Sequence, residues 1–283
     1  MPIELRSVCY TYAPGTSLEV NALEDISLSV SDGEFVGIMG RTGCGKSTLI
    51  QLLAGLLTPS AGEILIDGAD INAKSYKRDI LRRKVGVVFQ YPEIQLFETT
   101  VEKDVAFGLR HLGLTKEAEQ AAVYEALKAV GFDYYKVKDQ SPLSFSGGEK
   151  RRLAIAGVLA VSPRILILDE PVAGLDPLGR ADFLRLLDEL NAKGVTILMI
   201  SHNADALSEH VGRIVVLKEG RLLHDGPSEE VFSDYEGLTQ DGIGVGHVRY
   251  TAELLRRRGV DLPRDIIRYE QLLEKLKQIY GGG

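Results

Sequence analysis

Apolar and polar positions divide the chain into strand-like and helix-like stretches. Near the N-terminus two stretches alternate apolar and polar residues, which predicts a pair of antiparallel strands. Later stretches are short, continuous runs of branched aliphatic residues, as in a sheet that is buried on both faces. The last two predicted strands form a hairpin that turns at Glu219 and Gly220. The predicted strands are residues 4–12, 23–30, 34–40, 62–68, 84–90, 164–171, 195–201, 213–220 and 221–226.

Helical periodicity replaces the strand pattern in two regions. Between the strands at 84–90 and 164–171 we predict an all-helical insertion, roughly residues 92–161. Residues 231–283 form a second, C-terminal helical region, which we separate from a main domain at 1–230. Residues 263–280 have an amphipathic pattern, and the final glycines favour a frayed end. The apolar side of that pattern comprises Ile266, Tyr269, Leu272, Leu273, Leu276 and Ile279.

Composition excludes several classes of protein. The 283 residues are 45 % hydrophobic, which is enough for a substantial core. A net charge of −7 argues against a protein whose task is to coat nucleic acid. The chain has only Cys9 and Cys44, so we expect reduced thiols and no disulfide framework. No apolar run approaches the ~20 residues that a membrane span needs, and we expect no signal peptide.

The stretch GRTGCGKST, residues 40–48, matches the phosphate-binding loop pattern G-x-x-x-x-G-K-[ST]. A predicted strand precedes it and a helix follows, which a chance glycine turn would not require. Its backbone N–H groups can hold phosphates, with Lys46 on the β and γ oxygens and Ser47 on Mg²⁺. We therefore predict ATP and Mg²⁺ as cofactors. The nucleotide-binding residues are Gly40, Arg41, Thr42, Gly43, Cys44, Gly45, Lys46, Ser47 and Thr48.

Two acidic residues, Asp169 and Glu170, lie at the end of the predicted buried strand in ILILDEP. Asp169 can hold Mg²⁺ through water, and Glu170 at the strand tip can orient or deprotonate an attacking water. A merely solvated acidic pair is the alternative, but both residues directly follow a run that should be buried.

The patterns together predict an α/β P-loop NTPase with an N-terminal antiparallel β subdomain, a helical insertion and a short C-terminal helical appendage. Cys44 is interpreted as a small packing residue within the loop, in preference to a redox switch.

A further phosphate-binding pattern, SFSGGEKRR at 144–152, raises the question of which nucleotide it serves. It predicts a loop that enters a helix near Glu149 or Lys150. This segment resembles the signature motif LSGGQ of ATP-binding-cassette (ABC) ATPases, and the phosphate loop, LDEP, AGLD and a histidine after a strand follow that family's order. The resemblance covers roughly residues 1–230. It implies head-to-tail pairing of two cassettes, in which Ser146, Gly147, Gly148 and Glu149 bind the partner's ATP in trans.

The signature departs from the family pattern at Phe145 and Glu149. The glutamate replaces a glutamine and adds negative charge near a phosphate. We expect Lys150, Arg151 and Arg152 to compensate for this charge.

The resemblance assigns roles to three more residues. Gln90 resembles the glutamine that reaches Mg²⁺ and the attacking water, and we place it at the end of a strand. His202 resembles the switch histidine that contacts the γ-phosphate. Tyr12 resembles the aromatic residue that stacks on adenine. The ordinary alternatives are a polar strand end for Gln90, a structural histidine for His202 and core packing for Tyr12. On this basis the catalytic residues are Glu170, His202 and Gln90, and the metal-binding residues are Ser47, Gln90 and Asp169.

Residues 88–114, with YPEIQLF followed by TVEKDVAFG, resemble the ATPases of energy-coupling-factor (ECF) transporters, which import vitamins or cobalt and nickel ions. The resemblance implies a second ABC ATPase as partner, either a copy or a paralogue. It also implies a transmembrane energising subunit, and indirectly a small membrane subunit that binds the substrate. The expected location is the cytoplasmic face of the cell membrane, with peripheral attachment. The C-terminal helices would help to hold the dimer.

Other members of the wider family remain as alternatives. An ordinary ABC importer ATPase would share the core motifs but not the segment after Gln90. Soluble ABC ATPases that act on nucleic acid or ribosomes have long coiled-coil insertions or two cassettes with a basic linker, and this chain has neither. We therefore expect no nucleic-acid partner.

Overall fold

The computed structural model describes residues 2–280, so the predicted fraying of the final glycines lies outside these residues. The first sheet is antiparallel, in the order β2 (Val20–Val30), β1 (Ile3–Tyr12), β4 (Ala61–Ile66), β5 (Ala69–Asp70). The second has the order β10 (Arg221–Pro227), β9 (Arg213–Lys218), β3 (Phe35–Met39), β8 (Thr196–Ile200), β7 (Ile165–Asp169), β6 (Val85–Val88). All its neighbours pair in parallel except the β9–β10 hairpin. The α/β class and the N-terminal antiparallel subdomain are confirmed.

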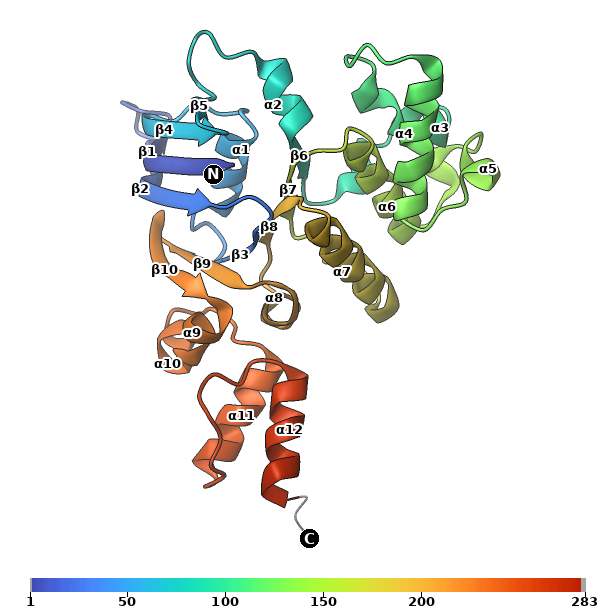
Figure 1. Cartoon of the computed structure of the whole chain (residues 1–283). Helices are drawn as coiled ribbons and strands as arrows, with labels where there is room; N and C mark the ends of the chain where they lie inside the picture. The colour runs from blue at the N-terminus through green and yellow to red at the C-terminus, as the bar shows by residue number, and fades with distance from the viewer. Residues whose placement is uncertain (1, 281–283) are drawn as a thin grey trace.

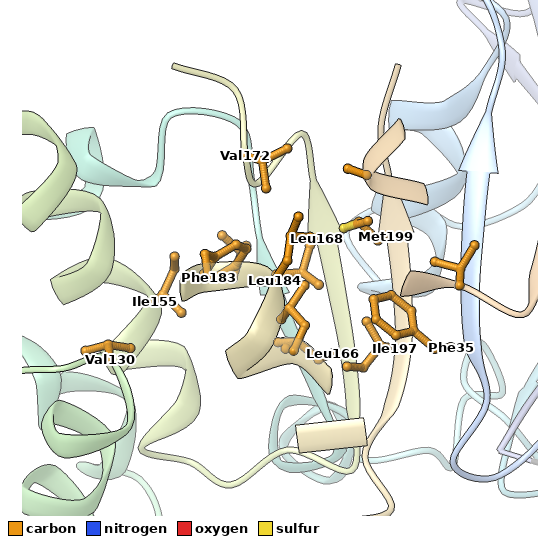
Figure 2. Packing of buried hydrophobic residues seen from close by; sticks show 14 of the residues in the cluster. Phe35, Val130, Ile155, Leu166, Leu168, Val172, Phe183, Leu184, Ile197 and Met199 are labelled. Carbon is orange, nitrogen blue, oxygen red and sulfur yellow. The ribbon is translucent and has the colours of Figure 1, made fainter. Parts of the chain in front are cut away.

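Strands β3, β7, β8 and β9 of the larger sheet are buried on both faces, which explains their continuous apolar runs. Alternate residues of β7 enter different cores: Leu166 and Leu168 pack with one cluster, Ile165 and Ile167 with the other. Figure 2 shows Leu166 and Leu168 beside Phe183 of α7 (Pro177–Ala192), with Ile155 and Val130 of the helical region beyond. The helical region therefore shares a core with the main sheet.

The remaining helices of the main domain are α1 (Lys46–Leu53), α2 (Arg78–Lys84) and α8 (Ala204–His210). Between β6 and β7 every described element is helical (Figure 1). These are η1 (Pro92–Gln95), α3 (Val101–Val105), η2 (Phe107–Leu109), α4 (Lys116–Ala129), α5 (Tyr134–Val137), η3 (Pro142–Ser144) and α6 (Gly147–Leu159). Within residues 2–280, no helix is long and apolar enough to cross a membrane.

The C-terminal region begins with α9 (Ser228–Ser233) and α10 (Tyr235–Gln240), followed by α11 (His247–Arg257) and α12 (Tyr269–Tyr280). Phe232 and Leu238 belong to the main core, so α9 and α10 pack with the main domain. Helices α11 and α12 have a small core of their own and extend away from the sheets (Figure 1). We call this pair the C-terminal helix pair.

The predicted amphipathic segment 263–280 is helical only from Tyr269. Its apolar residues also do not form one uniform stripe. Ile266 and Leu272 are buried against α11, and Leu276 is partly buried there. The large apolar and aromatic side chains left exposed on α12 are Tyr269, Leu273, Ile279 and Tyr280.

Candidate active site

The parallel strands bring the predicted site residues to one edge of the larger sheet. Strand β3 leads into the phosphate loop, β7 ends at Asp169, and β8 leads to His202. Ligands of open α/β sheets collect at this carboxyl edge. Our placement of Gln90 at the end of a strand is wrong, because β6 ends at Val88. Gln90 lies in the loop that follows, on the same edge, with its side chain exposed.

The phosphate loop is held in a shape that requires glycine. Gly40 has φ 147°, and a Cβ there would collide with the carbonyl oxygen of Leu217 and with Cys44 Sγ. Gly45 has φ 106° and caps the start of α1. The Lys46 ammonium lies across the loop and donates to the carbonyls of Gly40 and Arg41 at 2.6 and 2.9 Å. Cys44 is buried within the loop, in agreement with a packing role.

Tyr12 lies at the end of β1, beside the helix that follows the phosphate loop. Its hydroxyl is 3.1 Å from Thr48 Oγ1, and its ring meets that of Tyr10 edge to face at 4.8 Å. Tyr12 is 38 % exposed. This position suits an aromatic platform for a nucleotide base.

Glu170 and His202 are in direct contact. Glu170 Oε1 accepts a hydrogen bond from the His202 backbone N–H at 2.9 Å and lies 2.8 Å from His202 Nδ1. Ser201 Oγ lies 3.3 Å from Glu170 Oε2. Glu170 has φ +49°, an uncommon value for a residue with a side chain and one often found at functional sites. Because Nδ1 faces Glu170, Nε2 is the ring nitrogen of His202 that remains for a ligand.

Asp169 sits next to Glu170 at the end of β7. Burial raises the pKa of its carboxyl, and the neighbouring Glu170 raises it further, whereas Lys46 lowers it. A cation at this position would offset the cost of a buried negative charge. Asp169, Ser47 and Gln90 offer only oxygen ligands, which is the donor type that Mg²⁺ prefers. Within residues 2–280, no three His, Cys, Asp or Glu side chains are grouped so that they could hold a metal ion.

A cavity of about 480 Å³ joins part of the predicted site, and its lining does not include Tyr12, Ser47, Gln90 or Asp169. It is lined by Gly40, Lys46, Glu170 and His202, together with residues that the sequence did not point to. These additional residues are Gly242, Ile243 and Gly244 from the stretch that precedes α11. The glycine-rich sequence of this stretch was the only feature that could have drawn attention to it, and that feature does not indicate a position beside the phosphate loop.

The signature segment lies elsewhere and faces open space. Apart from its chain neighbours and the backbone of its own helix, a Cβ added at Gly147 or Gly148 would meet no heavy atom of residues 2–280 within 4 Å. Within residues 2–280, the lining of the 480 Å³ cavity contains no residue of the signature segment. The helix after it starts at Gly147, earlier than predicted, because Ser146 caps it and accepts a hydrogen bond from the Glu149 N–H. The Glu149 carboxylate accepts in return from the Ser146 N–H at 2.9 Å.

Glu149 is stabilised mainly by this capping box. Hydrogen bonds from the Ser146 side chain and backbone lower the pKa of the Glu149 carboxyl, and Arg152 contributes a smaller part. Our expectation that Arg151 also compensates for Glu149 is wrong. Arg151 is buried and donates instead to the carbonyls of Ala173 and Glu170, the latter at 2.7 Å. It therefore ties the signature helix to the loop that contains Glu170.

A phosphate loop, an acidic strand end, a histidine after the neighbouring strand and a separate signature on a helical insertion together define an ATP-binding cassette. Comparison with known proteins agrees. The family model "ABC transporter" matches residues 23–173. An energy-coupling factor transporter ATP-binding protein, EcfA2, of Clostridium acetobutylicum is 45 % identical over 99 % of this chain and 98 % of its own length.

Solved structures give the same result. CbiO1 from Clostridium perfringens, described as part of the ABC transporter complex cbiONQ, has a TM-score of 0.74 and 36 % identity over 90 % of this chain and 98 % of its own. The cassette MJ0796, solved as a dimer in a post-hydrolysis state bound to ADP and Pi, has a TM-score of 0.70 and 30 % identity over 80 % of this chain and 98 % of its own. The chain belongs to the ABC transporter family and, within it, to the ATP-binding proteins of ECF transporters.

Proposed function

We propose that this chain is the ATP-hydrolysing subunit that energises an ECF-type importer of a vitamin or a transition-metal ion. The observation that carries the proposal is the cavity lined by Lys46, Glu170 and His202 at the carboxyl edge of the sheet. ATP binds on the phosphate loop, with its base against Tyr12. Its hydrolysis drives closure of a pair of cassettes, and a transmembrane subunit receives this movement at the cytoplasmic face of the membrane.

The residues of the proposed site have different roles in hydrolysis. Glu170 accepts a proton from the attacking water as the new bond to the γ-phosphorus forms and the bond to the β-phosphate oxygen breaks. His202 orients the γ-phosphate through Nε2, since Nδ1 faces Glu170 at 2.8 Å. Ser47, Asp169 and Gln90 would hold Mg²⁺, which would supply positive charge against the negative charge that develops on the phosphate oxygens.

The exposed signature supports sites shared between two cassettes. Ser146, Gly147 and Gly148 are exposed and do not line the 480 Å³ cavity that contains Lys46. A second cassette placed head to tail would bring its phosphate loop to these N–H groups. Each ATP is then enclosed only when two chains have paired, so hydrolysis depends on dimerisation.

The segment after Gln90 supplies an apolar surface for the transmembrane subunit. Ile94 is 79 % exposed and Phe97 is 61 % exposed, and the Phe97 ring lies edge to face on Phe107 with 4.8 Å between centroids. Apolar side chains gathered on a surface in this way mark a contact with another protein. The surface formed by Tyr91, Ile94, Phe97 and Phe107 is here called the coupling surface.

The combined change Ile94→Asp and Phe97→Asp is expected to separate ATP hydrolysis from membrane attachment. Charges on the coupling surface should prevent docking, while Lys46 and Glu170 remain undisturbed. The measurement compares co-purification with the transmembrane subunit from membranes and ATPase activity of the isolated chain.

The matched control is Tyr135→Asp, a charge at another exposed aromatic residue of the helical insertion, on α5. It should leave co-purification unchanged. If the Ile94 and Phe97 variant still co-purifies as the wild type does, the coupling surface is not the contact with the transmembrane subunit.

The C-terminal helix pair is proposed to stabilise the dimer beyond the shared ATP. The pair buries Ile266 and Leu272 between its own helices but leaves several apolar residues of α12 exposed. Tyr269, Leu273 and Tyr280 recur at helical spacing, so they form one face. A matching face on a second cassette would cover them.

Leu273→Glu combined with Tyr280→Glu is therefore expected to weaken self-association or pairing with the other cassette in the absence of nucleotide. Both side chains are exposed, so the fold should be retained and ATP should bind as in the wild type. Sedimentation with and without ATP measures the effect. The control is Lys275→Glu, a charge change on the same helix away from that face. Unaltered association of the double variant would assign this helix face another role.

A further inference from the structure

Helix α8 connects the switch histidine to the C-terminal helix pair. It begins directly after His202 and Asn203. Hydrogen bonds join its first turn to the start of α11 and its last turn to the residue before α12. At its first turn, Asp205 Oδ1 accepts from the His247 N–H at 2.6 Å, and Asp205 Oδ2 lies 2.5 Å from His247 Nδ1. At its last turn, the Ser208 carbonyl accepts from Arg268 Nε at 3.0 Å.

The Asp205 carboxylate lies between the N-termini of two helices. It belongs to the first turn of α8 and accepts from the first residue of α11. Both helix N-termini favour a negative charge. The same carboxylate raises the pKa of the His247 imidazole by hydrogen bonding. The backbone before α11 lies close to Asp205 at Gly246, where φ is 77° and an added Cβ would be 2.9 Å from Asp205 Oδ1.

Residues 241–247, here called the linking segment, run from the phosphate loop to this contact. Asp241 pairs with Lys218 at 2.7 Å. Gly242 has φ 68° and lies so near Arg41 that a Cβ would be 3.4 Å from its Cδ. Gly244 follows, near the carbonyl of His202. The linking segment therefore touches the phosphate loop at one end and Asp205 at the other, and its middle lines the ATP cavity.

His202 depends on its backbone for its position. Its side chain is 77 % exposed, so packing does not hold the ring, and the contact with Glu170 is its main anchor. A small shift of α8 would move the backbone of His202 with it. Displacement of a reacting group by about 1 Å can cost about 100-fold in rate.

We infer that Asp205 is a positioning residue that couples the C-terminal helix pair to His202 through α8. The packing of α11 and α12 and the orientation of the switch histidine then depend on each other. Pairing of the helices between two cassettes would in this way favour the hydrolytic arrangement of His202. The inference rests on the proposed role of His202 at the γ-phosphate.

The test compares steady-state ATP hydrolysis by full-length Asp205→Ala, His247→Ala and wild-type protein. Asp205→Ala should lower kcat by about 10-fold and leave KM for ATP within about twofold, because it misplaces His202 without touching the phosphate loop. His247→Ala should lower kcat less, since the His247 N–H remains. The His247 side chain is 95 % exposed, so this variant keeps the fold intact even if Asp205→Ala does not fold. The two effects should not add in the double variant.

A similar contact at the other end of α8 provides the control. His210 Nδ1 lies 2.8 Å from Asp188 Oδ2 and ties α8 to α7 instead of to the C-terminal helix pair. Asp188→Ala should keep kcat within about twofold of the wild type. Asp205→Asn retains an acceptor for the His247 N–H and should recover part of the kcat lost in Asp205→Ala.

A parallel His202→Ala variant separates the inference from the function on which it rests. If His202→Ala loses turnover while His247→Ala and every Asp205 variant that folds retain the wild-type kcat, the coupling through α8 is wrong and the proposed function stands. If His202→Ala retains full turnover, the proposed role of His202 is wrong, and the coupling falls with it. Equal losses in the Asp188 and Asp205 variants would also overturn the inference, because they would reflect only the stability of α8.

Discussion

Glu170→Gln is expected to abolish ATP turnover while ATP binding is preserved. Glutamine keeps a carbonyl oxygen that can accept from the His202 N–H, as Glu170 Oε1 does at 2.9 Å. It cannot accept the proton of the attacking water at neutral pH, so a loss of about 100-fold to 10,000-fold in kcat is expected. With ATP bound and hydrolysis blocked, the two cassettes should remain closed around the nucleotide.

Three measurements on one preparation test this expectation: phosphate release, equilibrium binding of ATP, and sedimentation in the presence of Mg-ATP. Glu189→Gln, an exposed glutamate on α7, is the matched control and should behave as the wild type does. Full turnover by Glu170→Gln would remove the residue from the chemistry. Loss of ATP binding would show that its role is structural.

The strands of the larger sheet were predictable because local and long-range constraints agree there. The run of branched aliphatic residues 165–168, for example, is buried on both faces, and nothing polar interrupts it. The phosphate loop was predictable for a related reason. Gly40 and Gly45 adopt backbone conformations that glycine tolerates best, so the residue types themselves indicate the conformation of the loop.

Side-chain contacts between distant segments were not predictable in the same way. Arg151 follows Glu149 closely in the sequence, and near neighbours in a charge run suggest mutual compensation. In the structure Arg151 is buried beneath the loop of Glu170 instead, and Ser146 stabilises Glu149. A helix turns successive side chains in different directions, so proximity in sequence did not determine the partner.

The C-terminal region shows the limit of periodicity. The apolar spacing of 263–280 continues across Pro263 and Ile266, yet the helix begins at Tyr269, where the Glu209 side chain accepts from its N–H at 3.1 Å. That partner lies on α8, far away in the sequence. The approach of Gly242 and Gly244 to the ATP cavity likewise depends on how the C-terminal region folds back, which no local pattern contains.

The second large effect concerns the exposed signature. Ser146→Arg should leave ATP binding close to normal, because Lys46 and the rest of the phosphate loop are in another place. It should abolish hydrolysis, since a bulky cation would fill the surface that receives the partner's γ-phosphate. Loss of the cap costs about 1 kcal/mol of helix stability. Thr115→Arg removes the cap of α4 in the same insertion and controls for that cost.

The most direct test of shared sites is a mixed dimer with Lys46→Ala in one chain and Ser146→Arg in the other, isolated through two different affinity tags. The two chains are copies of this protein or this protein and its paralogous partner. If each ATP lies between one phosphate loop and the opposite signature, one site contains both lesions and the other contains neither. The mixed dimer should then hydrolyse ATP, although dimers with either lesion in both chains do not. A mixed dimer without activity would contradict sites shared between two cassettes.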